Sequence, residues 1–157
     1  MSRVLEALDN IYTHVSPGMA DLVYLLSCDD DAGLREIFGY ADKVRHEFMG
    51  DGVLLRGLIE FSNYCDNNCF YCGLNSENKR LRRYRMSESQ ILDCVAVLYS
   101  AGIKTVVLQS GEDWRMEAGW LKGVIKKIKD NFGIAVTLSV GERSLKDYML
   151  WREAGAD

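Results

Sequence analysis

The sequence lacks the features that mark membrane-spanning, secreted and nucleic-acid-binding proteins. No apolar run approaches the roughly 20 residues that a membrane-spanning helix needs. The N-terminus carries charged residues where a signal peptide has its apolar stretch. An excess of positive charge is also absent, because the net charge is −4, and this gives no broad attractive surface for nucleic acid or an anionic membrane. We therefore expect a cytoplasmic protein that binds neither.

A disulfide framework is missing as well. The five cysteines are odd in number and unevenly spaced, and a reducing compartment does not favour disulfides. Two of them, Cys28 and Cys94, lie within apolar helical patterns, where a free cysteine is often a small buried hydrophobe. These two are assigned no chemistry, which leaves a cluster of three.

The chain is long and apolar enough to build a globular core, with 48% hydrophobic residues among 157. Residues 1–50 have apolar side chains at helical spacing and predict a helical preamble. The first helix has an apolar stripe that ends at Val15, and the Ser-Pro pair at 16–17 offers a cap and a first-turn proline for the second. The aspartates at 29–31 open a third helix, which Gly50 is placed to end.

From residue 51 the pattern changes to strands that alternate with helices. Three short apolar runs predict strands: residues 53–61, 105–108 and 134–138. Helical patterns follow, with capping residues at Ser87 and Ser144. Alternation at about 30 residues per unit predicts parallel βαβ crossovers. The fold class is therefore α/β, with about three βα units over 51–157 after the helical segment.

The strongest chemical signal is a cysteine cluster directly after the first predicted strand. Cys65, Cys69 and Cys72 are spaced C-x3-C-x2-C, and thiolates are the soft ligands that zinc and iron–sulfur clusters select. A closed zinc site needs a fourth ligand, but His14 and His46 lie in the helical preamble. A [4Fe–4S] cluster on three thiolates instead leaves one iron open, and that iron could chelate the amino and carboxylate groups of a small molecule.

A second group of candidates follows the later strands, at the carboxyl ends where barrel enzymes gather their site residues. Small residues there let a ligand approach the backbone, and a carboxylate can receive an ammonium group. The candidates are Ser110, Gly111, Glu112, Ser139 and Glu142. The alternatives are an ordinary polar turn for the first three, and a strand end and a favourable charge at a helix start for the last two.

The cysteine loop resembles that of the radical S-adenosylmethionine superfamily, in which a C-x3-C-x-aromatic-C loop after the first barrel strand binds the cluster. The resemblance implies the N-terminal part of a (β/α)8 TIM-type barrel, a [4Fe–4S] cluster on the three cysteines, and S-adenosylmethionine as the second cofactor. It also implies that Tyr71, in the aromatic position, lies beside the adenine, although loop packing is the alternative. Ser110-Gly111-Glu112 resembles the Gly-Gly-Glu of the superfamily, in which the glutamate accepts from the methionyl amine.

Residues 59–157 resemble more specifically the HydE family of [FeFe]-hydrogenase maturases, in the segments IEFSNYC, NCFYCGL, the NK-L-RYRM run, KTVVLQSGED, VTLSVGE and EAGAD. This implies an enzyme that reductively cleaves S-adenosylmethionine to a 5′-deoxyadenosyl radical. The implied partners are a small-molecule or organometallic substrate, a low-potential electron donor and other hydrogenase maturation proteins. Biotin synthase-like and methylornithine synthase-like enzymes are alternatives on the same scaffold, and a non-catalytic iron–sulfur or zinc-binding fragment is the alternative of another class.

Two further expectations concern the basic run and the extent of the barrel. The run at 79–85 is the one patch that suggests nucleic acid, but it is short and the chain is otherwise acidic, so a solvated loop is favoured. The alternatives for this run are that it holds carboxylates or covers the cluster. Three strands cannot close an eight-stranded barrel, so we expect this truncated chain to be inactive alone.

Overall fold

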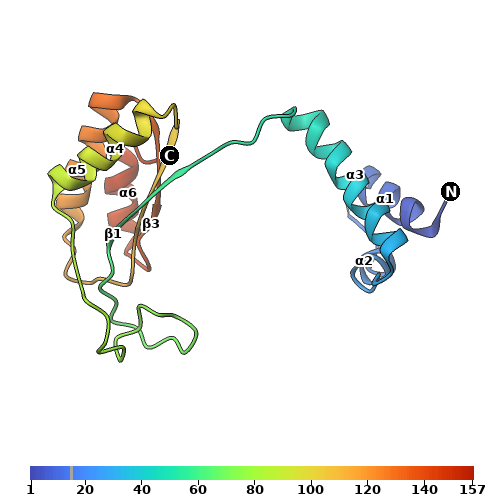
Figure 1. The fold of residues 1–157 in the computed structure, drawn as a ribbon, viewed down its shortest axis with the longest axis horizontal. Coiled ribbons are helices and arrows are strands. Elements are labelled where there is room, and N and C mark those ends of the chain that lie inside the picture. Colours follow the sequence, from blue (N-terminus) through green and yellow to red (C-terminus); the bar gives the residue numbers. More distant parts are fainter. Residues whose placement is uncertain (15) are drawn as a thin grey trace. The chain divides into compact units, whose positions relative to one another are not determined.

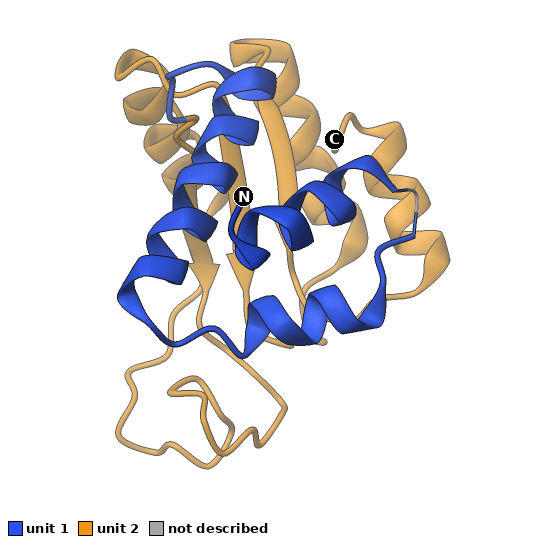
Figure 2. Cartoon of the chain, turned by 90° about the vertical axis from the view of Figure 1, so that its right-hand side faces the viewer, with its two compact units in different colours: residues 1–53 blue, residues 54–157 orange. Residues whose placement is uncertain are grey.

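The computed structural model describes residues 1–14 and 16–157. Val15, the last residue of the first predicted apolar stripe, lies outside the described residues. The chain divides into two compact units, residues 1–53 and residues 54–157, which Figure 2 shows in different colours. None of the helices in the described part of the chain combines the length and the apolar character needed to span a bilayer.

The first unit is built from α1 (Arg3–Thr13), α2 (Met19–Leu26) and α3 (Asp31–Met49). Helix α1 packs against both of the others, with Val4 and Ala7 buried. The ends of α3 follow the predicted chemistry, because the Asp30 side chain accepts a hydrogen bond from Gly33 N at 2.8 Å and Gly50 ends the helix with a φ of 67°.

Helix α2 begins later than predicted. The Ser-Pro pair at 16–17 precedes the helix without starting it, because Gly18 is still extended, with φ −68° and ψ 135°, and is itself the N-cap. Gly18 O accepts from Asp21 N and Leu22 N at 3.1 and 3.2 Å, so helical hydrogen bonding begins at that carbonyl.

The second unit alternates strands and helices: β1 (Gly57–Ser62), α4 (Glu88–Ser100), β2 (Thr105–Ser110), α5 (Ala118–Phe132), β3 (Ala135–Ser139) and α6 (Leu145–Glu153). The strands form a parallel sheet in the order β1-β2-β3, and the helices lie on one face of it (Figure 1). Each strand therefore connects to the next through a helix. The predicted α/β class is confirmed.

Strand β1 starts later than predicted, at Gly57 rather than at residue 53. Val53, Leu54 and Leu55 are 82%, 78% and 66% exposed. They lie before the point where the register of the sheet begins, with Gly57 opposite Val106. An apolar run without a pairing partner does not extend the strand.

The core of the second unit lies between the sheet and its helices. Its buried side chains include Ile59, Phe61, Val106, Leu108 and Val136 from the strands, and Ile91, Val95, Leu121, Val124, Ile125, Ile128 and Trp151 from the helices. The Trp151 indole N–H donates to Ala118 O at 3.0 Å, which joins α6 to the start of α5. This core fixes the three strands relative to one another.

Parallel order brings the carboxyl ends of all three strands to one edge of the sheet (Figure 2). The cysteine loop follows β1 at this edge, and the loops after β2 and β3 lie beside it. Ser87 caps α4 and Ser144 caps α6 as predicted, and Gln90 completes a capping box with Ser87. The predicted site residues therefore lie on neighbouring loops, where barrel folds place their active sites.

Candidate cofactor site

The loops at the carboxyl ends of the strands surround a cavity of about 330 Å³. Its lining contains the predicted residues Cys65, Cys69, Tyr71, Cys72, Ser110, Gly111, Glu112 and Ser139. The lining is completed by Asn67, Leu74, Asn75, Gln109 and Gly141. Glu142 is not part of it. The chain thus brings candidates from three separate loops to one cavity.

The cysteine loop holds its shape through hydrogen bonds of its own rather than through a helix or a strand. Cys72 N donates to Cys69 O at 3.1 Å, and Cys72 O accepts from Asn75 Nδ2 at 2.7 Å. Ser76 N donates to Asn67 O at 2.8 Å, which closes the loop across the cysteines. Backbone groups that lack a helical or strand partner are satisfied locally in this way.

Gly111 lets the loop after β2 pass directly against the cysteine loop. A β-carbon at this position would lie 2.4 Å from Tyr64 O and 2.8 Å from Cys65 Cβ. The two loops are joined beside this contact by a hydrogen bond from Asp66 N to Glu112 O at 2.9 Å. The glycine that the sequence predicts for ligand approach therefore also admits the neighbouring backbone.

The Glu112 carboxylate is fixed by the loop after β3. Its Oε1 and Oε2 accept from Glu142 N at 2.9 and 3.0 Å. Gly141, with a φ of 77°, leaves the space that the carboxylate occupies, since a β-carbon there would lie 2.4 Å from Glu112 Oε2. A carboxylate has about four acceptor positions, so Glu112 can still receive an ammonium group. Glu142 contributes its backbone N–H to this contact, and its side chain is not among those that line the cavity.

Tyr71, Ser110 and Ser139 occupy different positions around the cavity. The Tyr71 ring lies at the rim and is 92% exposed. The Ser110 hydroxyl is mostly buried and donates to Gly111 O at 2.9 Å. Ser139 is the last residue of β3 and also lines the cavity, so a strand end and a cavity wall are both accurate descriptions of it.

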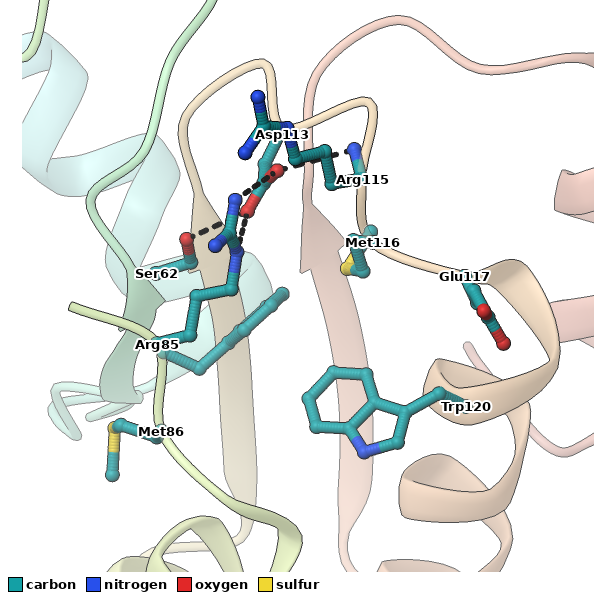
Figure 3. A pocket seen from close by; sticks show the side chains of 9 residues that line it. Ser62, Arg85, Met86, Asp113, Arg115, Met116, Glu117 and Trp120 are labelled. Atoms are coloured by element: carbon teal, nitrogen blue, oxygen red, sulfur yellow. Dashed lines mark hydrogen bonds and ion pairs between the residues drawn. The ribbon is translucent and has the colours of Figure 1, made fainter. Parts of the chain in front are cut away.

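An ion pair whose carboxylate the sequence analysis did not identify joins these loops on the side of the helices. The Asp113 side chain, 2% exposed, accepts from Arg85 Nε and Nη2 at 2.6 and 2.8 Å and from Ser62 Oγ at 3.0 Å (Figure 3). The Arg85 guanidinium lies 3.7 Å from the centre of the Tyr64 ring. Burial raises the pKa of Asp113, but the hydrogen bonds from Arg85 and Ser62 outweigh it, and the pKa is lower than usual. Asp113 is thus an ionised structural anchor.

The basic run at 79–85 is therefore not simply a solvated loop. The favoured interpretation as a solvated loop is wrong for Arg85, for which the alternative of holding a carboxylate is confirmed, and for Arg83, which donates to three backbone carbonyls. Arg85 also lines a second cavity of about 280 Å³, together with Met86, Met116 and Trp120 (Figure 3). In the sequence, the one signal for these contacts was the basic run itself, because Asp113 lies 28 positions beyond Arg85.

The donor set around the first cavity fits an iron–sulfur cluster. Three free thiols line it, beside a carboxylate that can take an ammonium group. Among the described residues, no three His, Cys, Asp or Glu side chains converge as the ligands of a single ion would. A cubane offers a separate iron to each thiolate, so its ligands lie farther apart than those of one ion. Three thiols and four irons leave one iron without a protein ligand.

Comparison with known proteins identifies the family, although no protein-family profile matches the chain. The [FeFe] hydrogenase maturase subunit HydE of Thermotoga maritima is 46% identical over 129 residues, which are 82% of this chain and 37% of that protein. The 3-methylornithine synthase of Methanosarcina acetivorans is 32% identical over 139 residues, 87% of this chain and 39% of that protein. The crystal structure of methylornithine synthase (PylB) has a TM-score of 0.86 at 29% identity, covering 99% of this chain and 45% of that one.

This chain belongs to the radical S-adenosylmethionine superfamily. Its three βα units are part of the barrel of that superfamily, which confirms the predicted architecture. Members of the superfamily use a [4Fe–4S] cluster and S-adenosylmethionine, the cofactor pair implied by the cysteine loop. The chain spans less than half the length of the relatives described above.

Proposed function

We propose that this chain carries the cofactor-binding part of a radical S-adenosylmethionine enzyme of the [FeFe]-hydrogenase maturase type. The observation that carries the proposal is the single cavity that gathers the three thiols of Cys65, Cys69 and Cys72 with the carboxylate of Glu112. Thiols supply ligands for a cluster, and a fixed carboxylate supplies an acceptor for the amino group of a bound cofactor.

Each residue has a defined part in the proposed chemistry. The three thiolates hold the cluster and leave one iron for the amino and carboxylate groups of S-adenosylmethionine. When bound, the cluster supplies one electron that cleaves S-adenosylmethionine to methionine and a 5′-deoxyadenosyl radical. Glu112 accepts from the methionyl ammonium group, and Glu142 N keeps the Glu112 carboxylate in place. The remaining proposed cofactor contacts are Tyr71, Ser110, Gly111 and Ser139.

The maturase type is favoured by the higher sequence identity to HydE than to 3-methylornithine synthase. The proposal includes a small-molecule or organometallic substrate, a low-potential electron donor and other hydrogenase maturation proteins as partners. Methylornithine synthase-like chemistry is the second candidate, because the PylB structure matches nearly the whole chain. A ligand of either reaction should perturb the spectrum of the cofactor-loaded chain when added. A response to methylornithine, which is the product of such a synthase, but not to a cysteine-bound iron complex would favour the second candidate.

The proposal is tested by anaerobic reconstitution with iron and sulfide, followed by electron paramagnetic resonance of the reduced chain with and without S-adenosylmethionine. We expect a cluster signal that changes when S-adenosylmethionine is added. Cys72→Ala should abolish the signal. Cys94→Ala is the matched control, because Cys94 lies on α4 and packs against the core. Uptake of zinc without iron, or equal loss of signal in the two variants, would contradict the proposal.

Glu112→Gln distinguishes binding of the cluster from binding of S-adenosylmethionine. The amide keeps the size of the side chain but loses the charge that attracts an ammonium group. We expect this variant to retain the cluster signal and to lose most of its response to S-adenosylmethionine. An unchanged response would remove Glu112 from the proposed site.

A further inference from the structure

The cysteine loop leaves and rejoins the body of the second unit through a narrow neck, formed by residues 61–63 and 82–86. The two sides of the neck lie antiparallel: Ser62 bridges Arg85, and Met86 N donates to Phe61 O at 2.7 Å. Between them, residues 64–81 contain no helix or strand. The conformation of this long segment therefore depends on contacts at the neck and within the loop.

Asn63 joins the two sides of the neck from a buried position. It is 4% exposed, its Oδ1 accepts from Tyr84 N at 2.7 Å, and its Nδ2 donates to Arg82 O at 2.9 Å. Its backbone N also donates to Tyr84 O at 3.3 Å. Both polar atoms of the buried amide are thus paired, as burial requires.

Arg83 extends this connection from the neck to the far side of the cysteines. Its Nη1 donates to Asn63 O at 2.5 Å and to Leu74 O at 2.8 Å, and its Nη2 donates to Asn75 O at 2.6 Å. Asn63 precedes the three cysteines in the sequence, whereas Leu74 and Asn75 follow them. The planar guanidinium presents several donors in a fixed geometry, which a lysine ammonium does not reproduce.

We propose that Arg83 is a positioning residue for the cluster: by joining carbonyls on both sides of the three cysteines, its guanidinium keeps their thiols on the cofactor cavity. The side chain does not line that cavity, so it acts through the backbone. All three of its partners lie outside helices and strands, so losing it should loosen the loop without unfolding the sheet. The proposal rests on the proposed function for the identity of the cofactor, but the contacts exist in the cofactor-free chain.

The test compares Arg83→Met, which keeps the length of the side chain and removes every donor, with Arg83→Lys and with Arg80→Met. Arg80 is the matched control, because it is exposed, belongs to the same basic run, and its side chain donates no hydrogen bond within the described residues. Chymotrypsin can reach Phe70 and Tyr71, which are 99% and 92% exposed, so the cleavage rate reports how often the cofactor-free loop loosens into the extended backbone that the protease binds. We expect Arg83→Met to be cleaved at least about tenfold faster, because a tenfold change corresponds to losing about one hydrogen bond to a charged group and Arg83 donates three.

The second readout is the cluster itself after anaerobic reconstitution. We expect Arg83→Met to lose iron to a chelator about tenfold faster than Arg80→Met and to give broader resonance lines, with Arg83→Lys between them. The melting temperature of the cofactor-free chain should be the same in all three variants. The proposal would be overturned if Arg83→Met were cleaved and lost iron at the same rates as Arg80→Met. It would also be overturned if Arg83→Met had a lowered melting temperature that explained both its faster cleavage and its faster iron loss. If the unmodified chain takes up no cluster, the proposed function fails, and the cleavage rates still decide the role of Arg83.

Discussion

Replacing Gly111 with alanine should damage the cofactor site more than the fold. The added β-carbon would lie 2.4 Å from Tyr64 O and 2.8 Å from Cys65 Cβ, whereas ordinary contact begins near 3.4 Å. One of the two loops must therefore move by about 1 Å. Neither obstructing atom can rotate away, because one belongs to the backbone and the other is attached to it. The displacement consequently passes to Cys65.

The cost to folding should be modest. Overpacking of this kind costs about 1–3 kcal/mol, and we expect the lower end because the cysteine loop lies outside the sheet and can shift. A loss of about 1 kcal/mol lowers the melting temperature of a unit of this size by about 4–8 °C. Cluster binding is less tolerant, because a shift of about 1 Å is large beside a metal–sulfur distance of about 2.3 Å. We expect at least a tenfold weaker hold on iron, the order of loss seen when residues that orient metal ligands are changed.

Two measurements separate these effects: thermal unfolding of the cofactor-free chain, followed by circular dichroism, and iron and sulfide content after anaerobic reconstitution. Gly73→Ala is the matched control, because Gly73 lies in the cysteine loop and an added β-carbon there meets nothing within 4 Å. The reasoning is refuted if Gly111→Ala retains as much iron as the unmodified chain. It is also refuted if Gly73→Ala loses iron to the same extent.

Three further predictions concern neighbouring features. Gly141→Ala places a β-carbon 2.4 Å from Glu112 Oε2 at a φ of 77°, so the spectral response to S-adenosylmethionine should fall while the iron content stays unchanged; equal loss of iron would contradict this. Asp113→Asn should make the free energy of unfolding depend less on pH in the acidic range. The folded pKa of Asp113 is lowered, so its contribution is present above the unfolded pKa of about 3.9 and is lost as the pH falls through the folded value. Urea unfolding should therefore show that the free energy of unfolding falls more in the unmodified chain than in Asp113→Asn as the pH drops from about 5 to about 2. An equal fall in the two chains would contradict this prediction. Gly123→Ala in α5, where an added β-carbon meets nothing within 4 Å, should stabilise the chain by about 0.5–1 kcal/mol, and a lower melting temperature would reveal a contact not accounted for.

Features that depend on neighbours in the sequence were predictable. The capping box of Ser87 and Gln90, and the glycine that ends α3, involve residues within one helical turn of each other, so the local pattern contains the whole interaction. The order of strands and helices follows from the same short-range periodicity. The C-x3-C-x2-C spacing is also local, so the sequence alone identifies the cysteine loop.

Features that depend on distant partners were not predictable from one sequence. Arg85 and Asp113 are 28 positions apart, and a basic run has the same composition whether its side chains are solvated or paired. The start of β1 is a similar case, because Val53 and Leu54 are as apolar as the strand residues that follow, and only the pairing with β2 decides where the strand begins. The strand or helix propensities of single residues give no information on the Arg85–Asp113 ion pair or on the pairing of β1 with β2.

The register of the sheet adds a property of the site that no single strand reveals. Glu60 lies opposite Gln109, and Gln109 lies opposite Ser139, so three polar residues form one row across the strands. Alternation along each strand places this row on the face opposite the core, because Ile59 and Leu108, which precede Glu60 and Gln109, are buried against the helices. Gln109 and Ser139 line the cofactor cavity. The row of polar residues that contains Gln109 and Ser139 therefore extends across the sheet to Glu60, whereas the row before it contains the apolar Leu58 and Val107. The face opposite the helices is polar at the carboxyl ends of the strands, where the cavity lies, and apolar farther from the site.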